Sequence, residues 1–189
     1  SGAYVYVTNT ETGTIEATGT AAVFGVIASA YYDATVENAG SIVANGYSGA
    51  YGVRATASAA EGHVSVTNYE TGSIEAEALL AVGVYAGGYD VDVSNAGSID
   101  ASSDVFAIGV EALAGYAEVS NSGSISVDSS LVAVGILAAG ASGVDVANSG
   151  SIDATGNVAV GVQVSGQDLA VTNAEAGTID VTGYASAAG

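Results

Sequence analysis

Few residues of this chain could carry out acid–base or nucleophilic chemistry. It contains one His, His63, and one basic residue, Arg54, against twenty Asp and Glu residues, and it contains no Cys. Thiol nucleophiles, disulfides and thiolate metal sites are therefore excluded. His63 follows Glu61 and Gly62 in an expected loop, and no set of base, acid and nucleophile can be assembled around it or around Arg54. We therefore expect no enzyme activity, no catalytic residues and no organic cofactor.

The carboxylates are the remaining candidates, because hard oxygen ligands suit Ca²⁺. Asp92, Glu118 and Asp145 occupy one position in three successive copies of a repeat. Carboxylates stacked about 5 Å apart repel one another unless salt screens them or a cation bridges them. A calcium site normally converges several oxygens on one point, and the chain lacks the tandem Gly-rich nonapeptides of calcium β-rolls. We expect a solvated acidic surface, with Ca²⁺ binding by these three residues as the alternative.

The charge balance excludes whole classes of partner. The formal net charge is -19 at pH 7, and a single basic residue cannot form a basic patch for DNA, RNA or anionic lipid. The longest apolar stretches, residues 79–89 and 131–141, are interrupted by Gly and fall short of the ~20 residues of a membrane helix. We expect neither nucleic-acid binding nor membrane insertion. Because 49% of the residues are hydrophobic, the chain should nevertheless fold.

A repeated segment organises the chain. It reads V-x-N followed by G-[ST]-I, and three copies have two additional residues between Asn and Gly. A second anchor, G-[VI], lies 9 or 10 residues after each of the first six Ile residues of the repeat. Each repeat thus holds three short segments in which apolar and polar residues alternate, which is typical of strands separated by turns. The Asn residues of the repeat are Asn9, Asn38, Asn68, Asn95, Asn121, Asn148 and Asn173.

A repeat of ~26 residues is too short to bury an apolar face alone, so successive repeats must stack. Each strand would then pair in parallel with its equivalent in the next repeat. No segment has the 3.6-residue periodicity of an amphipathic helix. The sequence therefore predicts one all-β domain over residues 1–189, a three-sided parallel β-helix of about seven coils.

Stacking turns each repeat position into a row of side chains. The Asn residues fall on the inward parity at the end of the third strand, where we expect a left-handed bend and amide bonds between coils. On the second strand the parity places Ala and Gly outward, as in Ala107 and Gly109. That row is either a flat contact face or a means of tight stacking. The third outward member of each second strand varies along the chain, as Ile27, Arg54, Tyr85, Glu111, Leu137 and Gln163.

The pattern V-x-N-[SA]-G-[ST]-I-[DE]-A, followed by A-x-G-V-x-A, resembles the β-helical passenger repeats of bacterial autotransporters and filamentous haemagglutinin-like adhesins. The resemblance covers almost the whole chain. It implies a secreted or cell-surface bacterial protein with a β-helical fold. Such passengers serve as stalks, adhesins and matrix proteins, so the resemblance implies no particular ligand.

The leading functional interpretation is a structural extracellular protein, either a fibre subunit or an adhesin stalk. Open ends of a β-helix can template further pairing, so we expect copies to associate head to tail, unless the native chain continues beyond both ends. Ice binding is a further alternative, disfavoured because acidic residues interrupt the [ST]-I-[DE] rows. The other alternative is an adhesin module that binds glycan or a host surface through Tyr31, Tyr32, Tyr47, Tyr85, Tyr89 and Tyr116.

Overall fold

The computed structural model describes residues 2–189, and all the regular structure in this range is β-strand. The thirteen strands of this range form one continuous set of parallel pairs. They are β1 (Gly2–Asn9), β2 (Thr14–Gly19), β3 (Ala22–Asn38), β4 (Ser41–Gly46), β5 (Gly49–Ala57), β6 (His63–Asn68), β7 (Ser73–Gly87), β8 (Asp90–Asn95), β9 (Ser98–Asn121), β10 (Ser124–Ser129), β11 (Val132–Asn148), β12 (Ser151–Asn173) and β13 (Thr178–Ala188).

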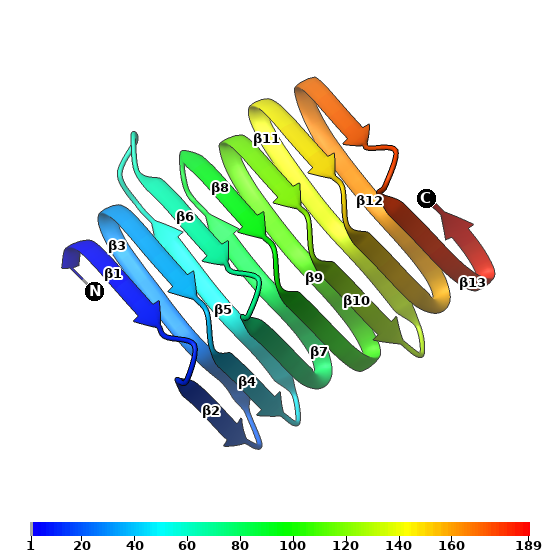
Figure 1. Cartoon of the computed structure of the whole chain (residues 1–189), viewed down its shortest axis with the longest axis horizontal. Coiled ribbons are helices and arrows are strands. Elements are labelled where there is room, and N and C mark those ends of the chain that lie inside the picture. Colours follow the sequence, from blue (N-terminus) through cyan, green and yellow to red (C-terminus); the bar gives the residue numbers. More distant parts are fainter. Residues whose placement is uncertain (1) are drawn as a thin grey trace.

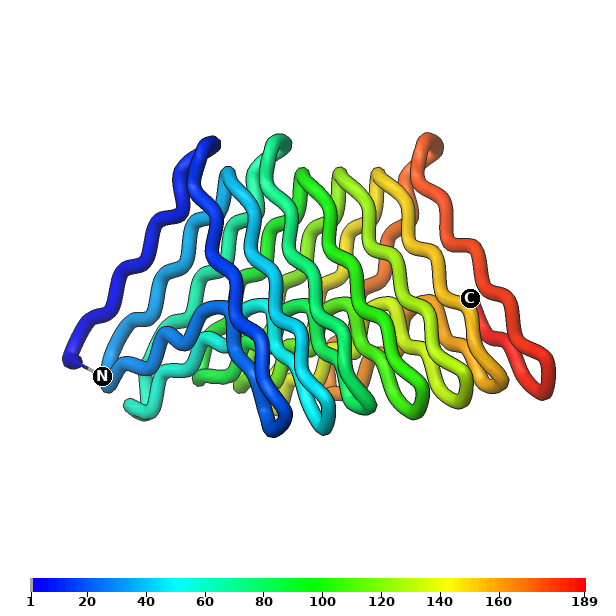
Figure 2. Tube along the Cα trace, turned by 90° about the horizontal axis from the view of Figure 1, so that it is seen from below, coloured from blue at the N-terminus to red at the C-terminus, as the bar shows by residue number. Residues whose placement is uncertain are grey.

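The strands wind into a solenoid of stacked coils, each with three faces (Figures 1 and 2). The first face holds the segments that follow the Asn-to-Gly turn, such as β10. The second face holds the A-x-G-V segments, such as residues 132–140 of β11, and the third face holds the segments that end at the repeated Asn, such as residues 143–148. Several strands bend at the corners without a break, and β9 continues through all three faces.

Equivalent repeat positions lie side by side in neighbouring coils. Ile125 pairs with Ile99 and Ile152, and Asn148 pairs with Asn121. The three copies with two additional residues keep this register and place the extra residues in loops at 10–12, 69–71 and 174–176, which project at the top of Figure 2. The all-β parallel solenoid of about seven coils, predicted from the repeat, is confirmed.

Rows of Val, Ala and Ile fill the interior of the solenoid. Ile42, Ile74, Ile99, Ile125 and Ile152 are 0% exposed, because each is covered by its equivalents in the coils on either side. The core is therefore a stack of thin layers, each built from one coil. Within residues 2–189 no helix is long and apolar enough to cross a membrane.

The repeated Asn residues form a hydrogen-bonded ladder along the inside of one corner. Asn95 Nδ2 donates to Asn121 Oδ1 over 2.8 Å, and the same bond of 2.7–2.8 Å joins every neighbouring pair from Asn9 to Asn173. Asn95 Nδ2 also donates to the carbonyl oxygens of Gly97 and Ser124. The inward ladder is confirmed, but the expected left-handed bend is wrong. No residue other than Gly within 2–189 has a positive φ, so the corner is made without a left-handed Asn.

The second face differs from the expectation in which residues point outward. Ala107 is 0% exposed, and a Cβ placed on Gly109 would lie 2.4 Å from Ile125 Cγ2 in the core. Both Ala and Gly therefore face inward, which corrects the expected outer row of small residues. Alternation is interrupted at Gly109, because this Gly and Val110 both face the interior. Ile108, between Ala and Gly, points outward and packs in a cluster separate from the core.

Candidate functional site

The third face carries the acidic row expected from the sequence. Glu118 pairs in register with both Asp92 and Asp145. The backbones that carry neighbouring carboxylates are therefore one strand spacing apart, about 4.8 Å. The row continues to Ser65 on one side and Ala170 on the other. Within residues 2–189 no group of three His, Cys, Asp or Glu side chains could hold a metal ion. The register places the three carboxylate residues in line along the solenoid, and Ca²⁺ binding by Asp92, Glu118 and Asp145 stays a prediction.

His63 and Arg54 lie on different faces. His63 begins β6 in a row between Asp33 and Asp90, and its backbone N–H donates to Asp33 Oδ1 over 3.4 Å. Arg54 lies on the outer side of the second face, with its guanidinium carbon 5.4 Å from the centre of the Tyr85 ring. The structure therefore does not bring the two residues together.

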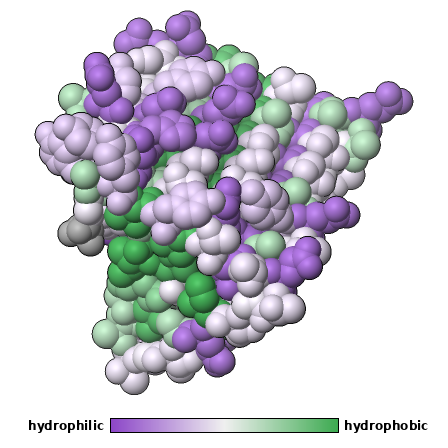
Figure 3. All heavy atoms as spheres, turned by 60° about the vertical axis from the view of Figure 1, so that its left-hand side comes forward, coloured by the Kyte–Doolittle hydropathy of each residue, from purple (hydrophilic) through white to green (hydrophobic). Residues whose placement is uncertain are grey.

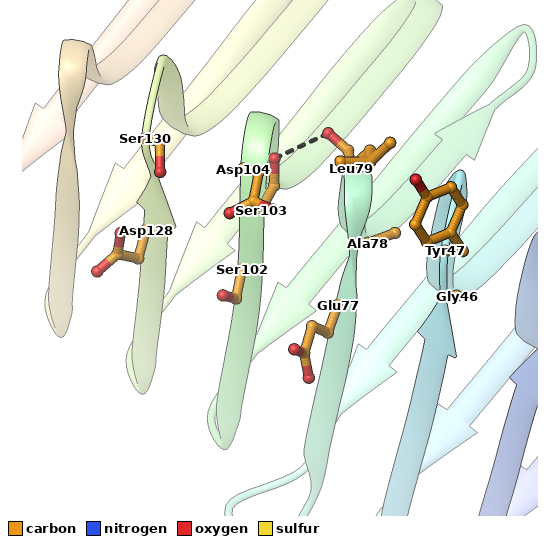
Figure 4. A pocket seen from close by; sticks show the side chains of 10 residues that line it. All are labelled: Gly46, Tyr47, Glu77, Ala78, Leu79, Ser102, Ser103, Asp104, Asp128 and Ser130. Atoms are coloured by element: carbon orange, nitrogen blue, oxygen red, sulfur yellow. Dashed lines mark hydrogen bonds between the residues drawn. The ribbon is translucent and has the colours of Figure 1, made fainter.

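A groove of about 380 Å³ lies at the corner between the first and second faces. Figure 4 shows Glu77, Ser102 and Asp128 on three successive coils of this groove, where Ser102 pairs with both carboxylate residues. Its other polar lining residues are Tyr47, Ser103, Asp104 and Ser130. Because Glu77 and Asp128 are two strand spacings apart, about 10 Å at the backbone, their carboxylates are suited to separate hydrogen-bonding partners rather than to one ion.

Hydrogen bonds of the half-buried Ser103 fix the wall of this groove. Ser103 Oγ donates to the carbonyl oxygen of Leu79 over 3.0 Å and accepts from the backbone N–H groups of Val105 and Phe106. Sequence reasoning missed the groove. The signal that could have found it is the last outward position of the first-face strand, where Glu77, Ser102 and Asp128 follow one another in successive coils.

The six candidate Tyr side chains lie at three separate places. Tyr31 packs edge to face on Tyr32 with ring centres 4.7 Å apart, and Tyr32 stacks on Tyr4 at 5.6 Å. Tyr89 and Tyr116 follow at the same corner, between the second and third faces, in later coils. Tyr47 lies at the opposite corner of the second face and Tyr85 lies on it. The six Tyr residues through which the alternative adhesin module would bind therefore do not form a single patch.

Two further Tyr residues share one carboxylate. The hydroxyl groups of Tyr6 and Tyr69 both donate to Glu37, the latter over 3.2 Å. This hydrogen bond raises the pKa of each phenol, because loss of the proton would remove the bond and set two negative charges side by side. The sequence pattern did not indicate the contact, since Tyr69 lies in one of the extra loops.

Burial affects two carboxylates outside the third face. Glu111, on the second face, pairs with Tyr85 and Leu137, and its pKa is raised because burial disfavours the charged form. Asp100, on the first face, has its pKa raised for the same reason. The row of Asp100 also contains Glu75 and Asp153. The outer side of the first face is thus polar and acidic.

The first and last coils leave core residues partly open. Ile15 and Ile179 are only partly buried, whereas their equivalents in the five coils between them are fully buried. Figure 3 brings the N-terminal side forward and shows hydrophobic atoms gathered there, bordered by hydrophilic ones. The Asn ladder also has a direction, since every amide donates toward the C-terminal coil. It therefore has an acceptor end at Asn9 and a donor end at Asn173.

Compared with known proteins, the chain matches no family model, no curated protein and no solved structure at a significant level. The geometry of the solenoid itself is therefore the basis for the functional conclusion.

Proposed function

We propose that this chain is a non-catalytic structural β-solenoid, used outside the cell or on its surface as a fibre subunit or adhesin stalk, and that copies associate head to tail. The observation that carries the proposal is the polarity of the Asn ladder. Asn173 Nδ2 at one end and Asn9 Oδ1 at the other are the two halves of the bond that repeats along the solenoid. A copy added in register would continue both the ladder and the Ile row.

A rod built in this way resists bending and local unfolding. Every coil bonds to the next through parallel backbone pairing on three faces, and the ladder adds one side-chain bond per coil in the interior. Buried side-chain nitrogen and oxygen atoms within residues 2–189 all have hydrogen-bond partners. Such satisfaction of buried polar groups favours a single rigid arrangement.

The extracellular location is supported by the resemblance to passenger repeats and by the surface charge. A formal net charge of -19 keeps a rod soluble but opposes association, and salt at physiological strength screens that repulsion beyond roughly 8 Å. Antibody labelling of intact source cells tests this part of the proposal, because a cytoplasmic chain would be labelled only after lysis.

Electron microscopy of the purified 189-residue chain at increasing concentration in saline tests the head-to-tail association. We expect rods whose lengths are multiples of one solenoid. The variant Ile15→Glu places a charge on the open first coil and should leave only single rods. Thr18→Glu places the same charge on the exposed side of β2 and should not shorten them. Single rods of the unmodified chain at every concentration would contradict the proposal.

A second candidate function, glycan binding, is favoured by the groove of Figure 4. Sugars stack on aromatic rings and donate hydroxyl hydrogen bonds to carboxylates, and Tyr47 lines the same groove as Glu77, Ser102 and Asp128. A glycan array followed by titration calorimetry tests it. Tyr47→Ala should abolish any binding that is found, whereas Tyr184→Ala, which removes an exposed ring elsewhere, should preserve it.

A further inference from the structure

The outer side of the second face is apolar over most of its area, unlike the polar first and third faces. Two complete rows contain only apolar side chains or Gly. The first row runs through Ala22, Gly49, Leu80, Phe106, Val132 and Val158, and the second through Phe24, Tyr51, Val82, Ile108, Val134 and Val160. Leu80 of the first row is 51% exposed, whereas Val82, Ile108 and Val134 of the second row are only 6%, 3% and 4% exposed. Larger side chains of this face, such as Phe106 and Tyr85, pack over the second row and form the surface that meets solvent.

A third row on this face carries the only two charges, and they have opposite signs. It reads Ile27, Arg54, Tyr85, Glu111 and Leu137 in five successive coils. Arg54 therefore lies one coil before Tyr85 and Glu111 one coil after it. Within these five coils the row is apolar at both ends and its two charges are symmetric about Tyr85; in the next coil it continues to Gln163.

We propose that the second face binds a second copy of this chain face to face, with the coil order reversed about the coil of Tyr85. The two copies are related by a two-fold axis that runs parallel to the strands and lies between them at the coil of Tyr85. This operation places each row of one copy opposite the same row of the other copy. Arg54 then faces Glu111 of the second copy, twice per dimer, and Ile27 faces Leu137. Sheets packed face to face lie ~10 Å apart, a gap that long Arg and Glu side chains can bridge.

The two apolar rows are self-complementary under the same operation. Gly49 faces Phe106, the smallest residue of the first row against its largest, and Leu80 faces its own equivalent. In the second row Tyr51 faces Ile108 of the second copy, and Val82 faces Val82 of the second copy. Small residues opposite large ones allow the side chains of two packed sheets to interdigitate.

Electrostatics favour this partner over others. Glu111 is flanked in its row by Tyr85 and Leu137, and burial raises its pKa, so an approaching guanidinium would stabilise its charged form. Arg54 is the chain's only Lys or Arg, and its row neighbours Ile27 and Tyr85 are uncharged. Two copies that each carry a charge of -19 can approach most easily through the one face where the formal charges cancel.

The available area is sufficient for a specific dimer. Five overlapping coils and about seven residues of strand cover roughly 24 Å by 23 Å, which is about 550 Å² per copy. Pairing would bury roughly 1,100 Å² in total, near the lower limit of specific interfaces, so a weak, salt-dependent dimer is expected. This association is lateral, so it is independent of head-to-tail growth and would join rods side by side in antiparallel order.

Sedimentation equilibrium of the 189-residue chain at about 0.5 M NaCl, where repulsion is screened, tests the proposal. We expect a monomer–dimer equilibrium. Arg54→Glu or Glu111→Arg alone should weaken dimerisation at least about tenfold, because like charges then face each other. The double variant Arg54→Glu with Glu111→Arg should restore it, since each pair is regenerated with the charges exchanged.

The matched control is Glu118→Arg, which makes the same charge change in the same coil on the third face and should leave the dimer unchanged or slightly tighter. Ile15→Glu, which blocks head-to-tail growth, should also leave it unchanged, so failure of either association can be recognised separately. A chain that remains monomeric in salt would overturn the lateral dimer. So would dimerisation that the single charge reversals do not weaken, or that the double variant does not recover.

Discussion

Asn95 Nδ2 lies 2.8 Å from Asn121 Oδ1, although the two residues are 26 positions apart in the sequence. Both side chains are almost completely buried, and each belongs to a different coil. One amide per coil thus satisfies a neighbouring amide and the carbonyls of its own corner. A short sequence motif becomes a continuous interior structure only because every copy is in register.

Substitution of one ladder residue should destabilise the whole solenoid. Asn121→Ala removes the acceptor of Asn95 Nδ2 and the donor to Asn148 Oδ1, and it leaves a small cavity. We expect the free energy of unfolding to fall by about 2 to 4 kcal/mol in urea denaturation. Ser126→Ala, an exposed change in the next strand, should stay within about 0.5 kcal/mol. Equal effects of the two variants would show that the ladder contributes nothing.

The inward Gly of the second face should tolerate no side chain. A Cβ at Gly109 would lie 2.4 Å from Ile125 Cγ2 and 2.6 Å from the carbonyl oxygen of Gly135. Gly109→Ala should therefore cost about 1 to 3 kcal/mol through overpacking, measured by thermal or urea unfolding. Gly49→Ala is the matched control, because its nearest neighbours lie at 3.8 Å or more, and dilute protein avoids effects of association. A neutral Gly109→Ala would contradict the close approach of the coils.

Stability should increase on mild acidification. Burial raises the pKa of Asp100 above 3.8 and that of Glu111 above 4.5, so the folded state binds more protons than the unfolded state just above these values. Below the pKa values that the two groups have in the unfolded chain, their full contribution to the free energy of unfolding is present. That contribution is lost as the pH rises through the pKa values of the folded chain. Urea unfolding of dilute protein between about pH 4 and pH 7 measures this.

The double variant Asp100→Asn with Glu111→Gln provides the control for the pH dependence. It should reduce the slope of the profile over that window, because neither amide titrates. If the unmodified chain gained no stability as the pH fell, or if the variant kept the full slope, the assignment to these two carboxylates would be wrong.

Repulsion along the acidic row should make stability dependent on salt. Glu118→Gln removes the central charge between Asp92 and Asp145 and should raise the free energy of unfolding by up to about 1 kcal/mol at low salt. The gain should shrink as NaCl is added. Glu11→Gln, in an exposed loop, should have a smaller effect. CaCl₂ should stabilise no more than NaCl of equal ionic strength, and a larger, saturable effect of millimolar Ca²⁺ would reveal a specific site.

The sequence by itself determined the repeat, the parallel stacking and the inward rows of the first and third faces. Val93, Asn95 and Ile99 are separated by even numbers of residues in nearly straight segments, so their parity could be counted directly. An inward row can be predicted from two things alone: the alternation of apolar and polar residues within each coil, and the same register between that coil and the next. The fold class followed because no helical pattern competed with this one.

Only the tertiary structure decided the second face. Gly109 and Val110 both turn inward. Alternation counted from before this bend places Ala107 inward and Ile108 outward, whereas alternation counted back from Val110 places them the other way round. The bend depends on how closely the Gly backbone approaches the Ile row of the next coil, which is a contact between faces rather than a local preference. That contact turned the expected row of small residues into the apolar face around Ile108. It also determined which Tyr residues meet, because the corners are set by the closure of each coil.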